Sequence, residues 1–267
     1  MERKFRIPLL RQADGRRTLA AVIDGREVNL LIDTGSDTYL SERIVRNEKL
    51  VDKPVRVGRA ALGPCASKVV SLDFSVPGLI GASRLSAFVG RYENSLTEGE
   101  FNVAFLRRFG HVLVDFLNNT LTLYPRNRDI LDILKEERFA SIGYLTLCGL
   151  RSRSRIIARN GILGARNNLL ILVDTGASRS VFSPHLRDVP VRRRGFLQDS
   201  EGNRRPAEMS LGQSLCIHPF EFCFSEITYC VTSTSIDVRL GMDVLDCCKI
   251  FIPCDPSQTA FLTLDFA

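Results

Sequence analysis

The hexapeptide LIDTGS, at residues 31–36, recurs 141 residues later as LVDTGA, at residues 172–177. The tripeptide LTL, at residues 121–123, recurs with the same spacing at residues 262–264. One short string can repeat by chance, but two strings that share one spacing indicate an internal repeat. We therefore interpret the chain as two homologous halves in tandem.

A third pair of segments fits the repeat with a spacing of 139 residues: FNVAFL at residues 101–106 and LGMDVL at residues 240–245. The agreement of three landmarks makes a duplication the simplest explanation. The predicted parts are residues 1–130, which carry the first Asp-Thr-Gly, residues 131–140, which connect the halves, and residues 141–267, which carry the second.

Short runs of β-branched and aliphatic residues precede each Asp-Thr-Gly string, and turn signals separate them. This spacing is typical of antiparallel strands, so each half is predicted to be all-β. The predicted strands are residues 5–10, 18–23 and 27–32 in the first half, and 144–148, 155–158 and 169–173 in the second. The turn signals are Asp14-Gly15, Asp24-Gly25, Asn160-Gly161 and Gly164. Short helices are predicted at residues 103–109 and 243–248, with a connecting helix at residues 128–138.

The composition is that of an ordinary globular protein, with 267 residues, 45% of them hydrophobic and 25% charged. No apolar run is long enough for a membrane-spanning helix, and the N-terminus has no signal-peptide pattern. We therefore expect a cytoplasmic protein without a membrane partner. Since no extended segment precedes the first predicted strand, we also expect no long N-terminal propeptide.

Seven of the eight cysteines follow residue 140. Without a secretory signal, they are expected to be reduced, buried, small apolar residues. The alternative is a zinc site formed by Cys216, His218, Cys223 and Cys230, although their spacing fits no standard zinc finger or ribbon. We predict no metal and no cofactor.

The net charge of +6 raises the question of nucleic acid, and arginines cluster within residues 151–159 and 192–194. Neither cluster alternates with stacking aromatic residues. We therefore expect no nucleic-acid partner and keep nucleic-acid binding as a third hypothesis.

Asp33 and Asp174 each follow an apolar strand, so each carboxyl is carried to the edge of a core, where a charge is costly unless it is paired or hydrogen-bonded. If the halves pack face to face, the two carboxyls meet and share one proton, which leaves one acid and one base. Such a pair can take a proton from water attacking an amide carbonyl and give one to the leaving nitrogen. The glycine of each string permits a sharp turn, and its threonine can bond across to the matching turn.

The two strings resemble the catalytic motifs of the retropepsin-like superfamily of aspartic proteases, and Arg239-Leu240-Gly241 resembles the family's later apolar-apolar-Gly motif. The whole chain resembles two retropepsin-like units fused together. The resemblance implies an all-β, bilobal acid-protease-like fold of two closed-barrel-like lobes with short helices and a cleft between them. It also implies an aspartic endopeptidase that hydrolyses a peptide or protein substrate with an activated water, as a monomer with pseudo-twofold symmetry and no cofactor.

Carried over by position, the resemblance assigns a role to ten residues. The second half has Ser178 where the first has Asp37, so we expect the halves to hold substrate unequally. The assigned residues are the catalytic pair Asp33 and Asp174, the supporting turn residues Thr34, Gly35, Thr175 and Gly176, and the substrate-binding residues Ser36, Asp37, Ala177 and Ser178.

The first half has Asn102 where the second has Gly241; we expect asparagine to be accepted there because it tolerates unusual backbone angles. Flap hairpins are predicted within residues 58–70 and 197–208. The alternative function is a non-catalytic peptide-binding or scaffold module. Two intact Asp-Thr-Gly strings favour the enzyme, since a binding protein could relieve the repulsion with one Asp-to-Asn change. The isolated histidines His111, His185 and His218 predict no histidine-based triad.

Overall fold

The structure is a computed structural model in which most of the chain is described. Part of the first arginine cluster, residues 151–154, lies outside the described residues, as does Glu201 in the second predicted flap. The described part is mostly β-strand, as the sequence predicts. The described residues are 3–51, 53–59, 62–94, 96–139, 141–148, 155–200, 202–232, 235–255 and 257–264.

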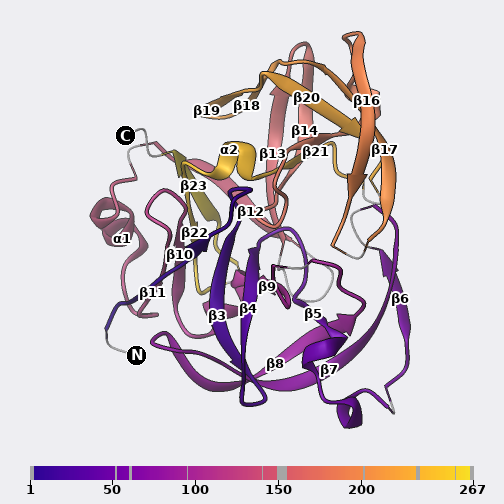
Figure 1. Cartoon of the computed structure of the whole chain (residues 1–267). Coiled ribbons are helices and arrows are strands. Elements are labelled where there is room, and N and C mark those ends of the chain that lie inside the picture. The colour runs from indigo at the N-terminus through magenta and orange to yellow at the C-terminus, as the bar shows by residue number, and fades with distance from the viewer. Residues whose placement is uncertain are drawn as a thin grey trace.

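Six strands of the first half close into a barrel (Figure 1). The pairing order is β3-β4-β9-β5-β8-β7, and β7 also pairs with β3. Along β3, the alternate residues Leu19, Ala21 and Ile23 are buried, which is the two-residue period of a strand with one face in a core. The barrel strands are β3 (Arg17–Ile23), β4 (Arg26–Asp33), β5 (Tyr39–Ser41), β7 (Pro64–Val76), β8 (Ile80–Gly90) and β9 (Gly99–Asn102). Two further strands, β2 (Leu10–Arg11) and β6 (Arg56–Arg59), pair with β3 and β7.

The second half repeats this order of pairing as β13-β14-β21-β15-β20-β17-β16. The parallel pair β4–β9 corresponds to β14–β21, and β5–β8 corresponds to β15–β20. An added hairpin, β18–β19, pairs with β13. These strands are β13 (Arg155–Leu163), β14 (Arg166–Val173), β15 (Val181–Phe182), β16 (Val191–Gln198), β17 (Arg204–Leu211), β18 (Ser214–Ile217), β19 (Phe220–Cys223), β20 (Glu226–Cys230) and β21 (Val238–Leu240).

A shared sheet joins the halves in the order β1-β11-β10-β22-β23-β12. Its central pair, β10 and β22, is antiparallel, with Leu113 opposite Phe251. The repeated LTL tripeptides lie in β11 and β23, one on each side of this pair. The strands are β1 (Phe5–Pro8), β10 (His111–Asp115), β11 (Thr120–Tyr124), β12 (Gly143–Cys148), β22 (Cys248–Ile252) and β23 (Ala260–Leu264).

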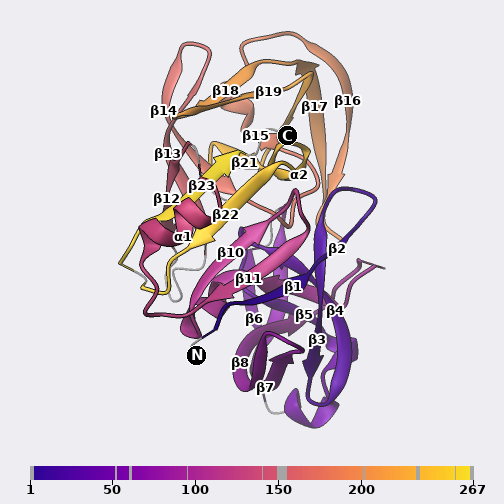
Figure 2. The same cartoon turned by 90° about the vertical axis from the view of Figure 1, so that its left-hand side faces the viewer.

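Helix α1 (Ile130–Glu136) lies beside the shared sheet, as Figure 2 shows. Its buried Ile133 and Leu134 pack with Tyr124 and Phe251. The Asp129 carboxylate caps its N-terminus by accepting hydrogen bonds from the next free backbone N–H groups. Within the described ranges, no helix has both the length and the apolar character needed to cross a membrane. The remaining helical segments are η1 (Glu42–Ile44), η2 (Asn47–Lys49), η3 (Val103–Arg108), η4 (Pro184–Leu186) and α2 (Met242–Leu245).

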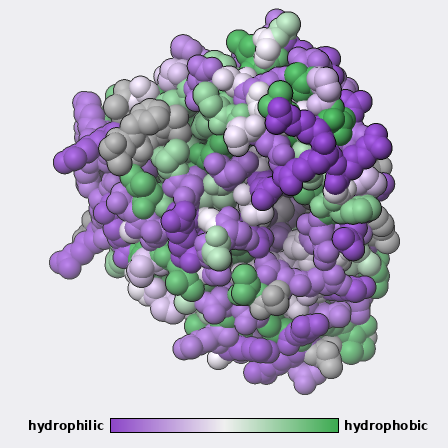
Figure 3. Space-filling view, turned by 45° about the horizontal axis from the view of Figure 1, so that its top comes forward, coloured by the Kyte–Doolittle hydropathy of each residue, from purple (hydrophilic) through white to green (hydrophobic). Residues whose placement is uncertain are grey.

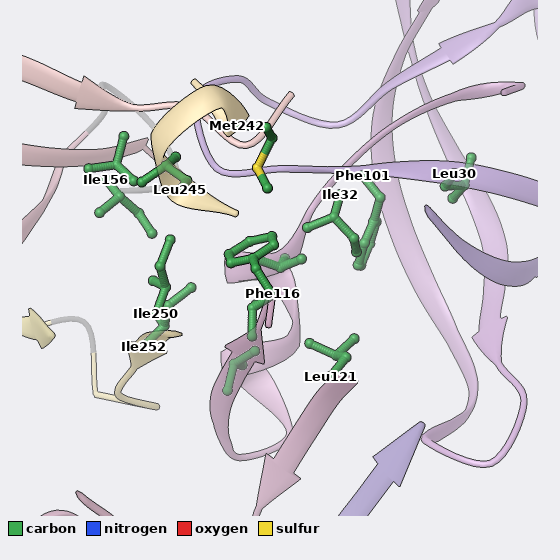
Figure 4. Close-up of a cluster of buried hydrophobic side chains, with 14 of the residues drawn as sticks. Leu30, Ile32, Phe101, Phe116, Leu121, Ile156, Met242, Leu245, Ile250 and Ile252 are labelled. Atoms are coloured by element: carbon green, nitrogen blue, oxygen red, sulfur yellow. The ribbon is translucent and has the colours of Figure 1, made fainter. Parts of the chain in front are cut away.

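One apolar core runs through both halves (Figure 4). Phe116, which follows β10, lies between Met242 of α2 and the first-half residue Leu121, and all three are buried. Side chains from both halves therefore contribute to one continuous core.

Three sequence predictions about the elements were wrong in detail. The segment at residues 5–10 is split into β1 and β2 because its two parts pair with different strands, β11 and β3. The predicted turn at Gly164 forms, but none forms at Asn160-Gly161, because β13 continues through a bulge there. The helix predicted at residues 243–248 ends at Leu245, because Cys248 already belongs to β22.

The surface is largely polar where Figure 3 shows it, with apolar residues in small groups between hydrophilic ones. This agrees with a chain of which 25% is charged. Apolar surface is concentrated in the interior, where it stabilises the packed halves.

Candidate active site

The two Asp-Thr-Gly strings form matching turns at the ends of matching strands. Asp33 is the last residue of β4, and Asp174 directly follows β14. Each of these strands has a parallel neighbour, β9 or β21, and both aspartates are almost completely buried. The buried strands fix where the carboxyls emerge, as the position of the strings after apolar runs predicts.

The threonines link the two turns, as predicted from their hydroxyl groups. The Thr34 hydroxyl donates to the carbonyl of Val173 at 2.7 Å, and the Thr175 hydroxyl donates to the carbonyl of Ile32 at 3.0 Å. The Thr175 N–H also donates to the Thr34 hydroxyl, at 3.2 Å. All these groups are buried, so each bond satisfies a polar atom that water cannot reach.

Each glycine packs against the aspartate of the opposite turn. A Cβ atom placed on Gly35 would lie 2.5 Å from Cγ of Asp174, and one placed on Gly176 would lie 2.7 Å from Cγ of Asp33. Any larger residue would collide with these carboxyls, so the glycines are required for close approach. This reciprocal packing brings the two carboxyl groups together.

Asp33 receives two neutral hydrogen bonds. The Gly35 N–H donates to one carboxyl oxygen and the Ser36 hydroxyl to the other, both at 2.6 Å. Burial raises the pKa of Asp33 well above the ordinary aspartate range, and the negative charges of Asp174 and Glu100 raise it further. The raised pKa favours the protonated form of Asp33.

Asp174 has a different set of donors. One oxygen accepts hydrogen bonds from the N–H groups of Gly176 and Ala177, at 3.0 and 3.1 Å. The other forms an ion pair with the guanidinium of Arg239. Both oxygens of Asp174 therefore have donors, and one of these donors is a cation, whereas both donors to Asp33 are neutral.

A cavity of about 410 Å³ lies over the two carboxyls. All four residues predicted to bind substrate line it, and so do both aspartates and both glycines of the strings. The lining also includes charged residues to which no sequence motif assigns a role: Arg16, Glu100, Arg155, Arg179, Asp199 and Arg239.

The sequence did contain a signal for two of these residues. When Asn102 is aligned with Gly241, Glu100 aligns with Arg239. These two residues carry charges of opposite sign within segments that are otherwise mostly apolar. A charge in such a segment is unusual because the neighbouring strands bury it, and this could have singled out both residues.

Asn102 fits under the first turn for a reason other than the predicted one. Its backbone is ordinary extended chain, with φ of −73° and ψ of 108°, so no unusual angle is involved. Its side-chain amide donates to the carbonyl of Ser36, and its side-chain oxygen accepts from the N–H of Ala104 at 2.8 Å. In the second half, a Cβ on Gly241 would lie 2.5 Å from the backbone of Arg179, so there the chain approaches too closely for a side chain.

Two hairpins, β6–β7 and β16–β17, occupy the segments predicted as flaps, and Figure 1 shows their ends approaching each other. The Leu62 N–H donates to the Asp199 carboxylate at 3.1 Å, and the Arg205 side chain donates to the carbonyl of Leu62 at 2.7 Å. Leu62 and Leu197 also pack in one apolar cluster and line the cavity. The hairpins therefore meet over the carboxyls.

The histidines lie away from this cavity, as far as the described residues show. His111 stacks on Phe251, His185 Nε2 lies 3.1 Å from the Asp237 carboxyl, and His218 is exposed. Across the described part of the chain, no three His, Cys, Asp or Glu side chains are grouped as a metal site. The cysteines of the zinc alternative are separate, with Cys230 buried against Leu62 and Cys223 exposed on β19.

A comparison of the sequence with protein-family models finds no match, and a comparison with curated proteins finds no significant match either.

Proposed function

We propose that this chain is an aspartic endopeptidase of bilobal, acid-protease-like architecture, formed from two retropepsin-like units. The observation that carries the proposal is the reciprocal packing of the two turns, in which each aspartate lies against the glycine of the other string. Two buried carboxyls held together in this way form a pair that shares a proton.

The arrangement of the strands supports this proposal. The two halves repeat one order of strand pairing and meet through β10 and β22, which corresponds to a pseudo-twofold relation within a single chain. The two hairpins are flaps over the carboxyls, and the cavity beneath them is the substrate cleft. The active unit is then a monomer, since one chain supplies both aspartates.

The chemistry follows from the pair. One carboxylate accepts a proton from a water molecule whose oxygen attacks the peptide carbonyl carbon, while the protonated carboxyl donates to the carbonyl oxygen. When the tetrahedral intermediate collapses, the C–N bond breaks and the leaving nitrogen takes the proton held by the first carboxyl. The second carboxyl recovers its proton from a hydroxyl of the intermediate, so the pair is restored.

The cavity supports a peptide or protein substrate. Leu62, Val181 and Leu197 supply apolar surface on the side of the hairpins, which favours apolar side chains next to the cleaved bond. Asp37 and Ser178, which follow the two Asp-Thr-Gly strings, both line the cavity. One is acidic and the other neutral, so the two halves can bind the main chain of the substrate unequally.

The test is digestion of a mixed peptide library by the purified 267-residue chain. We expect cleavage with an acid to near-neutral optimum, inhibition by a statine-type compound, and loss of cleavage in both Asp33→Asn and Asp174→Asn. Removing an acid or base of this kind lowers rates by about 10²–10⁴-fold. Cleavage at the wild-type rate in either folded variant would refute a pair split between the halves.

A second candidate is a non-catalytic peptide-binding module. The observation that favours it is the ion pair between Arg239 and Asp174, which gives one member of the pair a permanent cation as partner. Under this alternative, the wild-type protein binds library peptides or the statine-type compound and leaves every peptide intact.

A further inference from the structure

Two charged residues of opposite sign occupy the same position in the two halves. Glu100 of β9 is paired in register with Leu31, two residues before Asp33, and Arg239 of β21 is paired with Leu172, two residues before Asp174. Both side chains line the cavity over the aspartates. At this position the two halves have the same strand pairing but carry side chains of opposite charge.

Arg239 acts directly on Asp174. Its guanidinium, only 15% exposed, pairs with the carboxyl oxygen that does not accept the Gly176 and Ala177 N–H groups. Both oxygens of Asp174 thus have donors that favour negative charge. Protonating this carboxyl would break the pairing and leave a largely buried cation without its partner.

Glu100 acts on Asp33 from the other side. Its carboxylate lies 3.4 Å from the Ser36 hydroxyl, which is 2.6 Å from Asp33. Within the described ranges, Asp33 has no cation as partner, in contrast to Asp174. A buried negative charge close to Asp33 makes a second one there more costly.

Other charged groups also lie around the cavity. Arg16 donates to the carbonyl of Gly176, at 3.4 Å, rather than to either carboxylate of the pair. Asp199 is engaged by the hairpins. The other charged groups that line the cavity are Asp37, Arg155 and Arg179.

We propose that Glu100 and Arg239 are positioning residues that fix the shared proton on Asp33 and keep Asp174 as the carboxylate. The proposal rests on the proposed function and deepens it, because it gives each aspartate one role in hydrolysis. Asp174 accepts the proton of the attacking water, and Asp33 protonates the carbonyl oxygen of the substrate. The two roles do not interchange, since the fixed charges on either side of the pair differ in sign.

The first experiment needs no cleavage. The 267-residue chain is labelled with ¹³C at its aspartates and titrated by NMR, and the signal of the carboxyl group that ionises last is identified. We expect that signal to disappear in Asp33→Asn and to persist in Asp174→Asn. The reverse pattern would overturn the proposal even if the protein proves to be a protease, whereas the expected pattern would stand even if no peptide is cleaved.

The second experiment uses the two flanking residues. In Glu100→Gln, the late signal should ionise at a pH lower by roughly one unit, since a neighbouring negative charge is gone. In Arg239→Gln, the acid limb of the pH profile of kcat/KM should move up by roughly one unit, because Asp174 has lost its cation, and Arg239→Lys should restore it. Variants that lower kcat/KM equally at every pH, with both limbs unmoved, would show a merely structural role and contradict the proposal.

Discussion

The N–H of Thr175 donates a hydrogen bond to the hydroxyl of Thr34, 3.2 Å away, although the two residues are 141 positions apart in the chain. The Thr34 hydroxyl in turn donates to the carbonyl of Val173. A single side chain of the first half thus satisfies two buried backbone groups of the second, and the two aspartate-bearing turns are held as one unit.

Replacing Thr34 by valine tests this link. Thr34→Val keeps the shape but leaves the Val173 carbonyl and the Thr175 N–H buried without partners, at about 1–3 kcal/mol each. We expect the free energy of unfolding, measured with urea, to fall by about 2–4 kcal/mol. The matched control is Thr120→Val, because the buried Thr120 hydroxyl has no hydrogen-bond partner among the described residues. An equal effect of both substitutions would show that the link between the turns contributes nothing.

The close approach of the turns is tested at Gly176. In Gly176→Ala, the new methyl group would meet the Asp33 carboxyl at 2.7 Å, so the turns must separate. We expect a loss of stability of about 1–3 kcal/mol, and a fall in kcat/KM of about 100-fold from displaced carboxyls. Gly81→Ala is the control, because a Cβ there meets no atom within 4 Å and the backbone needs no positive φ. A Gly176→Ala protein as stable and active as Gly81→Ala would contradict the reciprocal packing.

The raised pKa of Asp33 predicts a stability change of definite sign. Above the ordinary aspartate pKa, the unfolded chain releases this proton and the folded chain keeps it, so stability falls as the pH rises toward the folded-state pKa. Asp33→Asn removes this loss, and we expect its Tm at pH 7 to exceed that of the wild type, by roughly 2–4 °C for each kcal/mol relieved. At a pH well below the ordinary aspartate pKa, the difference should vanish. Asp73→Asn is the control: Asp73 is exposed, Arg84 lowers its pKa, and no stabilisation is expected. A lower Tm for Asp33→Asn at pH 7 would contradict the raised pKa that burial and the neighbouring negative charges give Asp33.

The contact between the hairpins depends on Asp199. Its carboxylate accepts hydrogen bonds from Leu62 of one hairpin and from Asn203 of its own, at 3.1 and 2.7 Å. In Asp199→Ala, we expect the Leu62 amide to exchange its hydrogen about tenfold faster or more, which corresponds to a lost bond of about 1.4 kcal/mol. Asp199→Asn retains an acceptor oxygen and should exchange at an intermediate rate. Unchanged exchange in Asp199→Ala would show that the apolar contacts of Leu62 hold the hairpins without this carboxylate.

Much of the fold could be predicted because local signals agreed with the repeat. The apolar runs before each Asp-Thr-Gly became β3, β4, β13 and β14, and the helix predicted at residues 128–138 is α1. Element ends were less predictable. Asn160-Gly161 resembles a hairpin turn, but pairing with β14 extends the strand past it through a bulge. Strand pairing thus outweighed local turn preference at that point.

The candidate site was predictable where a motif marks it and was missed where only packing defines it. Eight of the ten selected residues line the cavity; the other two, Thr34 and Thr175, link the two turns beneath it. Glu100 and Arg239 could not be placed at the carboxyls without the register of β9 and β21, which sets the direction of each side chain. Asn102 was expected to fit under the first turn because asparagine tolerates unusual backbone angles. Its side chain instead supports the turn through two hydrogen bonds.

The sequence by itself determined the strand-rich character, predicted the duplication and singled out the two aspartates, because these depend on short strings, spacing and alternation along the chain. Only the tertiary structure decided that each aspartate lies against the opposite glycine, that two hairpins meet above them, and that one carboxyl faces Glu100 while the other faces Arg239. Those relations join residues that are far apart in the chain, and burial sets the strength of their charges, so they exist only once both halves are packed together.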